Sequence, residues 1–217
     1  MRYSTILFDL DGTLLDTLDD LTDAVNFALK GQGLPLCTRE EVRGYIGNGI
    51  VMLLSRAAKD RAREADAQKM LCDFKEYYAA HCQDKTRPYD GVMDLLQSLK
   101  ADGRKIGVVS NKVDFATKGL CEAYFGDYID VAIGENEEGG VRKKPAPDSV
   151  FEAMRILAVE PADTVYIGDS EVDIQTAKNA GLTCISVLWG FKDREFLLLN
   201  GATRLVATME ELKAVLQ

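Results

Sequence analysis

The sequence contains only one histidine, His81, among its 217 residues. A serine–histidine triad would have to use this residue, and a metal site with two histidine ligands is excluded. His81 stands at the end of a helical pattern, where a cation is favourable, so we expect it to be structural or solvent-facing. Any chemistry must therefore use carboxylates, hydroxyls and amines.

Cysteines are few and scattered, and no C-x-x-C pair is present. An odd number of separated cysteines is typical of reduced thiols, so we predict a cytoplasmic protein. No apolar run approaches the length of a membrane span, and the amino terminus does not show the pattern of a signal peptide. The cysteines are Cys37, Cys72, Cys82, Cys121 and Cys184.

Basic residues are in the minority, with 26 Lys and Arg against 35 Asp and Glu and a formal net charge of -9. This balance argues against a protein that binds nucleic acid or a membrane surface. An anionic substrate would have to be attracted by a local site and not by the field of the whole protein.

Strand and helix patterns alternate in the carboxyl-terminal part of the chain, from residue 88 onward. Such alternation predicts an α/β fold, in which a Rossmann-like parallel sheet carries helices on both faces. An apolar run at 6–8 adds a strand before this region. The other expected strands lie at 106–109, 131–133, 164–167, 183–187 and 205–206.

Residues 16–83 interrupt this alternation, because their pattern predicts helices without strands. One helical face carries Leu18, Leu21 and Val25, and a capping-box pattern begins at Thr38. A charged stretch at 59–66 is expected to be solvated. We therefore expect a core domain of residues 1–15 and 84–217 and an inserted helical domain of residues 16–83.

Two carboxylates, Asp9 and Asp11, follow the apolar run at 6–8 and stand just before Gly12. Residues i and i+2 of a strand point the same way, and open parallel sheets bind ligands at the carboxyl ends of their strands. Two close carboxylates repel unless a proton or cation lies between them, and oxygen ligands suit magnesium. A strand that ends in an Asp-Gly turn is the structural alternative.

Polar residues also stand near the ends of the later strands. Taken alone, each of them is more simply a turn residue, a helix cap or a surface lysine. Together they would place acids, a hydroxyl and a lysine on one edge of the sheet, which suits phosphoryl transfer. These residues are Ser110 and Asn111, Lys143 and Lys144, and Asp169 with Asp173.

The chain resembles the haloacid dehalogenase superfamily of phosphatases over essentially its whole length. The segment 9–13 is similar to the first family motif, 110–111 to the second, 144–147 to the third and 168–173 to the fourth. A helical cap between the first two motifs, the Gly-Asn-Gly loop at 47–49 and the Trp-Gly-Phe segment at 189–191 resemble the phosphoglycolate phosphatase-like branch. Asp90 departs from this pattern, since the family often has proline there.

The resemblance implies a role for each motif residue. Asp9 would be the nucleophile that forms an aspartyl-phosphate, and Asp11 would protonate the leaving oxygen and later activate water. Ser110 would hold a phosphoryl oxygen, and Lys144, which has a proline after it as Lys143 does not, would offset negative charge. Further contacts to the substrate are expected from Gly12, Thr13 and Asn111.

Magnesium is the cofactor that the resemblance implies. Asp9, the main-chain carbonyl of Asp11, and Asp169 would hold the ion. Asp173 would assist through a water molecule or by orienting Lys144.

The helical cap would act as a mobile lid, which excludes water in the first step and admits it in the second.

The substrate is expected to be a small phosphorylated metabolite, with phosphoglycolate favoured by the branch. Arg43, Asn48 and Arg56 in the helical segment are candidates to meet it, although each could be ordinary surface. A phosphomutase of the β-phosphoglucomutase type stays open as an alternative. A pyrophosphatase, a nucleotidase and a non-enzymatic phospho-aspartate switch are further alternatives. No nucleic-acid or membrane partner is expected, and the chain would act as a monomer or a homodimer.

Overall fold

The computed structural model describes residues 3–59 and 64–217 of the chain. The chain divides into two compact units, Met1–Leu15 with Pro88–Gln217 and Asp16–Arg87, which we call the sheet unit and the helical unit. It passes from one to the other through β2 (Leu15–Asp16) and β3 (Arg87–Pro88), which pair as a two-stranded sheet. The sequence did not predict these strands, because neither pair of residues is an apolar run.

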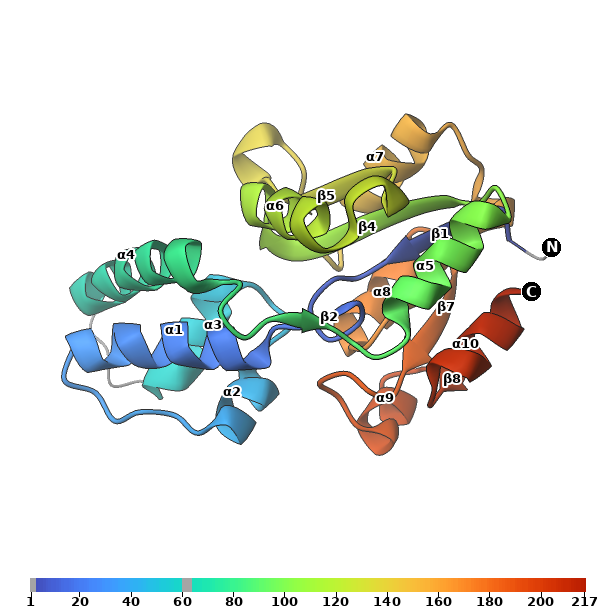
Figure 1. Ribbon diagram of the computed structural model, residues 1–217. Coiled ribbons are helices and arrows are strands. Elements are labelled where there is room, and N and C mark those ends of the chain that lie inside the picture. The colour runs from blue at the N-terminus through green and yellow to red at the C-terminus, as the bar shows by residue number, and fades with distance from the viewer. Residues whose placement is uncertain (1–2, 60–63) are drawn as a thin grey trace. The chain divides into compact units, whose positions relative to one another are not determined.

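The sheet unit contains a six-stranded sheet with the order β5-β4-β1-β6-β7-β8, in which every neighbouring pair is parallel (Figure 1). Helices surround this sheet, so the predicted α/β fold with a Rossmann-like parallel sheet is confirmed. The strands are β1 (Thr5–Phe8), β4 (Lys105–Val113), β5 (Val131–Glu135), β6 (Thr164–Gly168), β7 (Thr183–Val187) and β8 (Leu205–Val206).

β1 lies at the centre of this sheet, and all four of its residues are buried. Its last residue, Phe8, is in register with Val108 of β4 on one side and with Ile167 of β6 on the other. Because all three strands run in the same direction, the residues that follow these positions meet at one edge of the sheet.

The helices of the sheet unit cover the apolar strands. Leu7, Val109 and Tyr166 of the sheet belong to one buried cluster with Val150 and Met154 of α7. These two helical residues are four apart and so share the face that the 3.6-residue period predicts. The helices are α5 (Val92–Ala101), α6 (Asp114–Phe125), α7 (Asp148–Leu157), α8 (Glu171–Asn179), α9 (Arg194–Leu199) and α10 (Met209–Leu216).

β4 is longer than the sequence predicted. The expected strand ended at Val109, with Ser110 and Asn111 after it, whereas β4 continues to Val113. Its pairing with β5 is irregular between Val109 and Val113. Ser110 and Asn111 therefore lie within the distorted end of a strand, and their polar side chains hid this continuation from a pattern of apolar residues.

The helical unit contains α1 (Leu18–Gly31), α2 (Arg39–Tyr45), α3 (Ile50–Ala58) and α4 (Glu64–His81). α1 packs on α4 through apolar side chains, and the capping box expected at Thr38 is present. Residues 60–63 of the charged stretch expected to be solvated lie outside the described residues.

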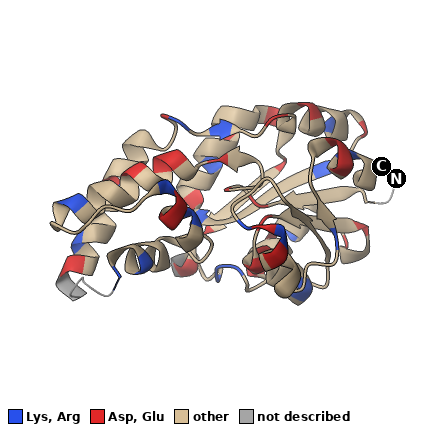
Figure 2. Cartoon of the chain, turned by 90° about the horizontal axis from the view of Figure 1, so that it is seen from below, with Lys and Arg blue, Asp and Glu red and all other residues tan. Residues whose placement is uncertain are grey.

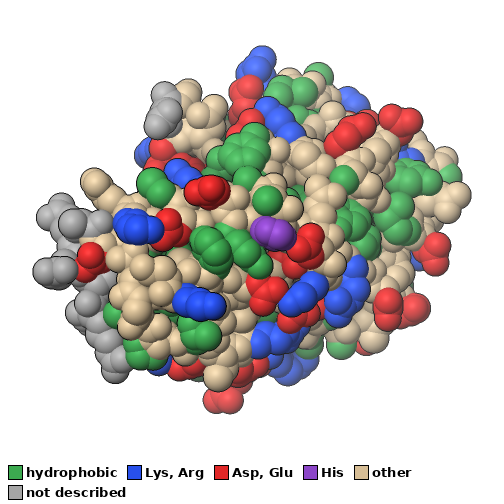
Figure 3. All heavy atoms as spheres, turned by 60° about the vertical axis from the view of Figure 1, so that its left-hand side comes forward, with side chains coloured by type: hydrophobic (Ala, Val, Ile, Leu, Met, Phe, Trp, Pro, Cys, Tyr) green, Lys and Arg blue, Asp and Glu red, His purple; other side chains and the backbone are tan. Residues whose placement is uncertain are grey.

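His81 lies at the surface of the helical unit, as Figure 3 shows for the single histidine of the chain. Its ring stacks on Tyr77, with ring centres 4.3 Å apart, and its Nδ1 lies 2.8 Å from a carboxylate oxygen of Asp84. These contacts are local to the end of α4, so the placement expected for His81 is confirmed.

Charged residues of both signs are interspersed along the ribbons, as Figure 2 shows. In the described ranges 3–59 and 64–217, no helix is long and apolar enough to cross a membrane.

Candidate active site

Asp9 stands at the carboxyl edge of the sheet, directly after β1, and its backbone N–H donates to Ile167 O at 2.8 Å. The chain then folds into a tight loop, in which Leu14 and Leu15 both donate to Leu10 O at 3.0 Å. Gly12 has a φ of +84° in this loop, which glycine adopts without strain. The apolar strand and the glycine turn together fix where the first carboxylate lies.

Lys144 reaches this carboxylate from a different segment. Its Nζ lies 2.8 Å from Asp9 Oδ1 and 2.7 Å from Asp173 Oδ1, and its side chain is only 3% exposed. Burial lowers the pKa of Lys144, but the opposite effect of Asp173 and Asp9 is larger. The net shift of this pKa is upward, so the group is an ammonium. Lys143 instead pairs with Glu137 at 3.3 Å and is 40% exposed.

The amide side chain of Asn111 holds the backbone of Lys144 in place. Asn111 Oδ1 accepts from Lys144 N at 2.7 Å, and Asn111 Nδ2 donates to Lys144 O at 3.0 Å. The residue expected to contact substrate is thus engaged in fixing the segment that carries the lysine.

Asp169 follows β6 and is enclosed by backbone. Its Oδ2 accepts from Phe191 N at 2.6 Å. A Cβ atom added at Gly12 would collide with the carboxylate of Asp169, and one added at Gly190 would collide with the same side chain. Glycine at both positions therefore allows two backbone segments to approach this carboxylate closely.

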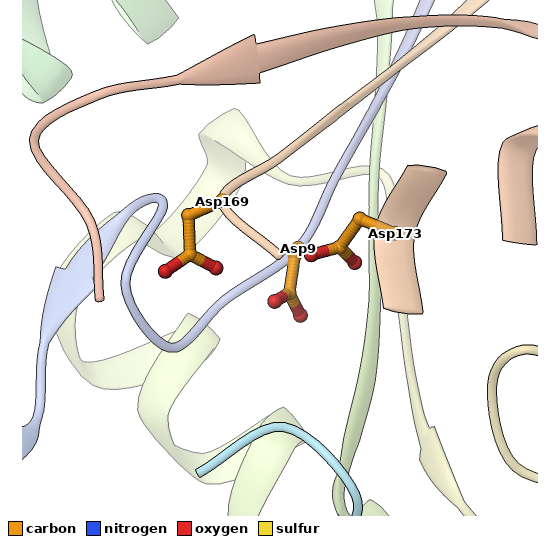
Figure 4. A group of neighbouring side chains, drawn as sticks. All are labelled: Asp9, Asp169 and Asp173. Carbon is orange, nitrogen blue, oxygen red and sulfur yellow. The ribbon is translucent and has the colours of Figure 1, made fainter. Parts of the chain in front are cut away.

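Asp9, Asp169 and Asp173 form a buried acidic cluster, whose side chains Figure 4 shows converging. One oxygen from each lies within 4.8 Å of the others. Burial and the neighbouring Asp173 raise the pKa of Asp9 to about 7, against the opposite effect of Lys144. Burial, followed by Asp173 and Asp9, raises the pKa of Asp169 well above its usual range.

Three carboxylates share this cluster with one lysine, and burial together with their mutual repulsion disfavours the charged forms of Asp9 and Asp169. A divalent cation would relieve this repulsion, and an all-oxygen donor set suits a hard ion such as Mg²⁺. The residues present therefore fit a magnesium site.

Both carboxylate oxygens of Asp173 already accept hydrogen bonds from protein groups. Oδ1 accepts from Lys144 at 2.7 Å and from the Tyr166 hydroxyl at 3.2 Å. Oδ2 accepts from Ser170 Oγ at 2.5 Å and from Ser170 N at 3.1 Å. This arrangement favours the role of orienting Lys144 over assistance through a water molecule, the two roles that the resemblance left open.

The side chain of Asp11 points to a different partner. Its Oδ2 lies 3.0 Å from Lys112 Nζ, in a pair whose side chains are 15% and 5% exposed. Its Oδ1, like Thr13 Oγ1, is buried and has no hydrogen-bond partner in the described part of the chain. Ser110, which is 3% exposed, accepts from Lys112 N through its Oγ at 3.2 Å.

Two of the three candidates from the helical unit, Arg56 and Asn48, interact with each other. Arg56 donates to Asn48 Oδ1 at 2.6 Å and to Tyr45 O at 2.8 Å. Arg43 lies 3.6 Å from Glu40, in a pair exposed to solvent.

Sequence reasoning missed Lys112 and Tyr166. The period of two along a strand could have identified Lys112, because it stands two residues after Ser110 and so shares its side of the strand. No comparable pattern marked Tyr166, which reads as an ordinary apolar position of β6.

Carboxylates and a lysine gathered at the carboxyl edge of a parallel sheet are groups that suit phosphoryl transfer. The family model of haloacid dehalogenase-like hydrolases matches residues 6–187. The chain therefore belongs to this family, and it is a phosphatase of the haloacid dehalogenase type.

Its relatives include the phosphoglycolate phosphatase of Aquifex aeolicus, which is 35% identical over 86% of this chain and 85% of its own length. That of Neisseria meningitidis is 34% identical over 94% and 88%. A solved structure from Lactobacillus delbrueckii subsp. bulgaricus, provisionally described as a phosphoglycolate phosphatase, is 39% identical with a TM-score of 0.92, covering 99% of this chain and 98% of that one.

Proposed function

We propose that the chain hydrolyses a small phosphate monoester through transfer of the phosphoryl group to Asp9. The observation that carries this proposal is the contact between Asp9 Oδ1 and Lys144 Nζ, 2.8 Å apart, within a buried acidic cluster at the carboxyl edge of the sheet. A nucleophilic carboxylate, a fixed cation beside it and oxygen ligands for a metal are the parts that phosphoryl transfer requires.

Magnesium would be held by Asp9, Asp169 and the main-chain carbonyl of Asp11. When bound, the ion would offset the negative charge of the carboxylates and of the substrate phosphate. Asp173 keeps Lys144 in place through its 2.7 Å contact.

Two steps follow from the residues. A carboxylate oxygen of Asp9 attacks phosphorus, the bond from phosphorus to the leaving oxygen breaks, and Asp11 gives that oxygen a proton. Asp11 then takes a proton from a water molecule, whose oxygen attacks phosphorus and releases inorganic phosphate with Asp9 restored. Ser110, Thr13 and the backbone at Gly12 would hold the phosphoryl oxygens.

The substrate that we propose is phosphoglycolate or a closely similar small ester, which rests on the names of the relatives. The helical unit would act as the cap that selects it, with Arg43, Asn48 and Arg56 as candidate contacts. A cytoplasmic location and a monomeric or homodimeric state stay predictions from the sequence.

The decisive experiment is phosphate release from a panel of esters with and without Mg²⁺. The panel contains phosphoglycolate, sugar phosphates, nucleoside monophosphates and pyrophosphate. We expect release that depends on Mg²⁺ and is abolished in Asp9→Asn, with a loss of at least about a thousandfold because the nucleophilic carboxylate is removed. A near-normal rate in this variant would overturn the assignment of the nucleophile.

Asp127→Asn is the matched control, since Asp127 is an exposed aspartate in the short helix Gly126–Tyr128 of the same unit. It should keep full activity. Release only when a sugar bisphosphate is supplied would favour the phosphomutase, and a long-lived phosphorylated protein would favour the phospho-aspartate switch.

A further inference from the structure

Each of the two reacting carboxylates has a lysine of its own. Lys144 contacts Asp9, and Lys112 contacts Asp11 at 3.0 Å. The two lysines come from different segments, Lys144 from the segment before α7 and Lys112 from the end of β4. The proposed function assigns no role to Lys112.

The position of Lys112 is fixed by its surroundings. Its N–H donates to Ser110 Oγ at 3.2 Å, and its carbonyl accepts from Thr117 Oγ1 of α6 at 3.2 Å. The side chain is only 5% exposed. Withdrawing an ammonium from water is costly, and a buried ion pair adds little net stability over apolar residues. A purely structural reason for this lysine is therefore weak.

The pair also makes the two oxygens of Asp11 different. Oδ2 is bound by Lys112, whereas the buried Oδ1 has no partner within the described ranges 3–59 and 64–217. A carboxyl group that must give a proton to one oxygen and later take one from another needs one of its own oxygens to be available in both steps. Here that oxygen is Oδ1.

We propose that Lys112 is a positioning residue, which holds Oδ2 of Asp11 so that Oδ1 is presented to the leaving group. The inference rests on the proposed function, because it requires Asp11 to transfer protons during phosphoryl transfer. The proton that reaches the leaving oxygen comes from Asp11, and Lys112 transfers none. As Asp11 gives up this proton it becomes anionic, and the adjacent ammonium stabilises the charge that develops.

The test compares leaving groups. Single-turnover transfer to Asp9 is measured in the full-length protein with Mg²⁺, using phosphoglycolate, whose leaving oxygen needs a proton, and 4-nitrophenyl phosphate, whose leaving group departs as a stable anion. In Lys112→Met we expect the rate with phosphoglycolate to fall at least roughly tenfold and the rate with 4-nitrophenyl phosphate to stay within about threefold. Lys112→Arg should recover part of the loss.

Lys118→Met is the matched control, because Lys118 lies on α6 and forms an exposed pair with Asp114. It should leave both rates unchanged. Thermal unfolding of all variants separates misfolding from a local effect, and Lys112→Arg keeps the test decisive where the methionine variant does not fold.

Asp11→Asn separates a failure of the role proposed for Lys112 from a failure of the proposed function. If this variant shows the same dependence on the leaving group but Lys112→Met slows both esters equally or neither, the role of Lys112 is overturned and the proposed function stands. If Asp11→Asn shows no such dependence, or the unmodified protein transfers from neither ester, the proposed function itself fails and the inference fails with it.

Discussion

Tyr166 has a buried hydroxyl group that contacts both Lys144 and Asp173. The hydroxyl lies 3.1 Å from Lys144 Nζ, 3.2 Å from Asp173 Oδ1 and 3.3 Å from Val109 O. Burial raises the pKa of Tyr166 well above its usual range, so the group keeps its proton. A tyrosine in the middle of β6 thus braces a polar contact inside an otherwise apolar cluster.

Replacing Tyr166 with Phe removes this hydroxyl and keeps the ring. We expect the free energy of unfolding to fall by about 1 kcal/mol, since one buried hydrogen-bonding group is lost. The value of kcat should fall several-fold, because Lys144 loses one of the contacts that hold it. Chemical denaturation and steady-state kinetics measure the two effects. Tyr128→Phe, at a half-exposed position, is the control, and equal effects in both variants would contradict the bracing role.

Asp20 of α1 forms hydrogen bonds with the segment at the end of the helical unit. Asp20, in the first turn of α1, is 2% exposed and accepts from Thr86 N at 2.8 Å and from Lys85 N at 3.0 Å. These two donors lie just before β3. The contact joins the beginning and the end of the helical unit.

Replacing Asp20 with Ala should destabilise the helical unit by about 1 to 3 kcal/mol, because it removes a buried carboxylate that accepts from two backbone N–H groups. Hydrogen exchange at the amides of Lys85 and Thr86 should accelerate. Asp23→Ala is the comparison, since Asp23 pairs with Lys85 Nζ in a contact whose side chains are 41% and 53% exposed. It should cost no more than about 1 kcal/mol, and a cost equal to that of the Asp20 variant would contradict the explanation.

The sequence predicted those elements whose apolar residues recur with a clear period, such as β6 and α7. It could not predict the continuation of β4 through Ser110, Asn111 and Lys112, because polar residues at the end of a strand look like a loop. Asp9 and Asp169 were candidates because each directly follows a strand that the sequence predicted. Lys112 was not a candidate, because it stands on the part of β4 that the sequence did not predict.

The stability of the whole molecule depends on pH through the ionisation of its acidic cluster. The pKa of Asp9 is raised from 3.8 to about 7 in the folded protein, so the folded state binds this proton more tightly than the unfolded state. Asp9 therefore contributes to the free energy of unfolding fully when the pH lies below its pKa in the unfolded chain. This contribution is lost as the pH rises through its pKa in the folded protein. Asp169, whose pKa is also raised, acts in the same direction.

Mg²⁺ should therefore raise the melting temperature of metal-free protein more at pH 8 than at pH 5, because protons compete with the cation at the lower pH. We expect a shift of a few degrees at pH 8, roughly what 1 kcal/mol produces in a chain of this size. Thermal unfolding with NaCl of equal ionic strength is the control. Asp169→Asn should reduce the shift, and equal shifts at both pH values would argue against cation binding at this cluster.

The central place of β1 has a consequence for how the protein is made. β1 is synthesised before both of the strands that flank it, because Thr5 pairs with Lys105 of β4 on one side and with Thr164 of β6 on the other. β1 can pair on both sides only after β4 and β6 have been synthesised. Asp169 directly follows β6 in the chain. The acidic cluster is therefore complete only after β6 and the first turn of α8 have been synthesised, and a nascent chain that ends before them lacks it.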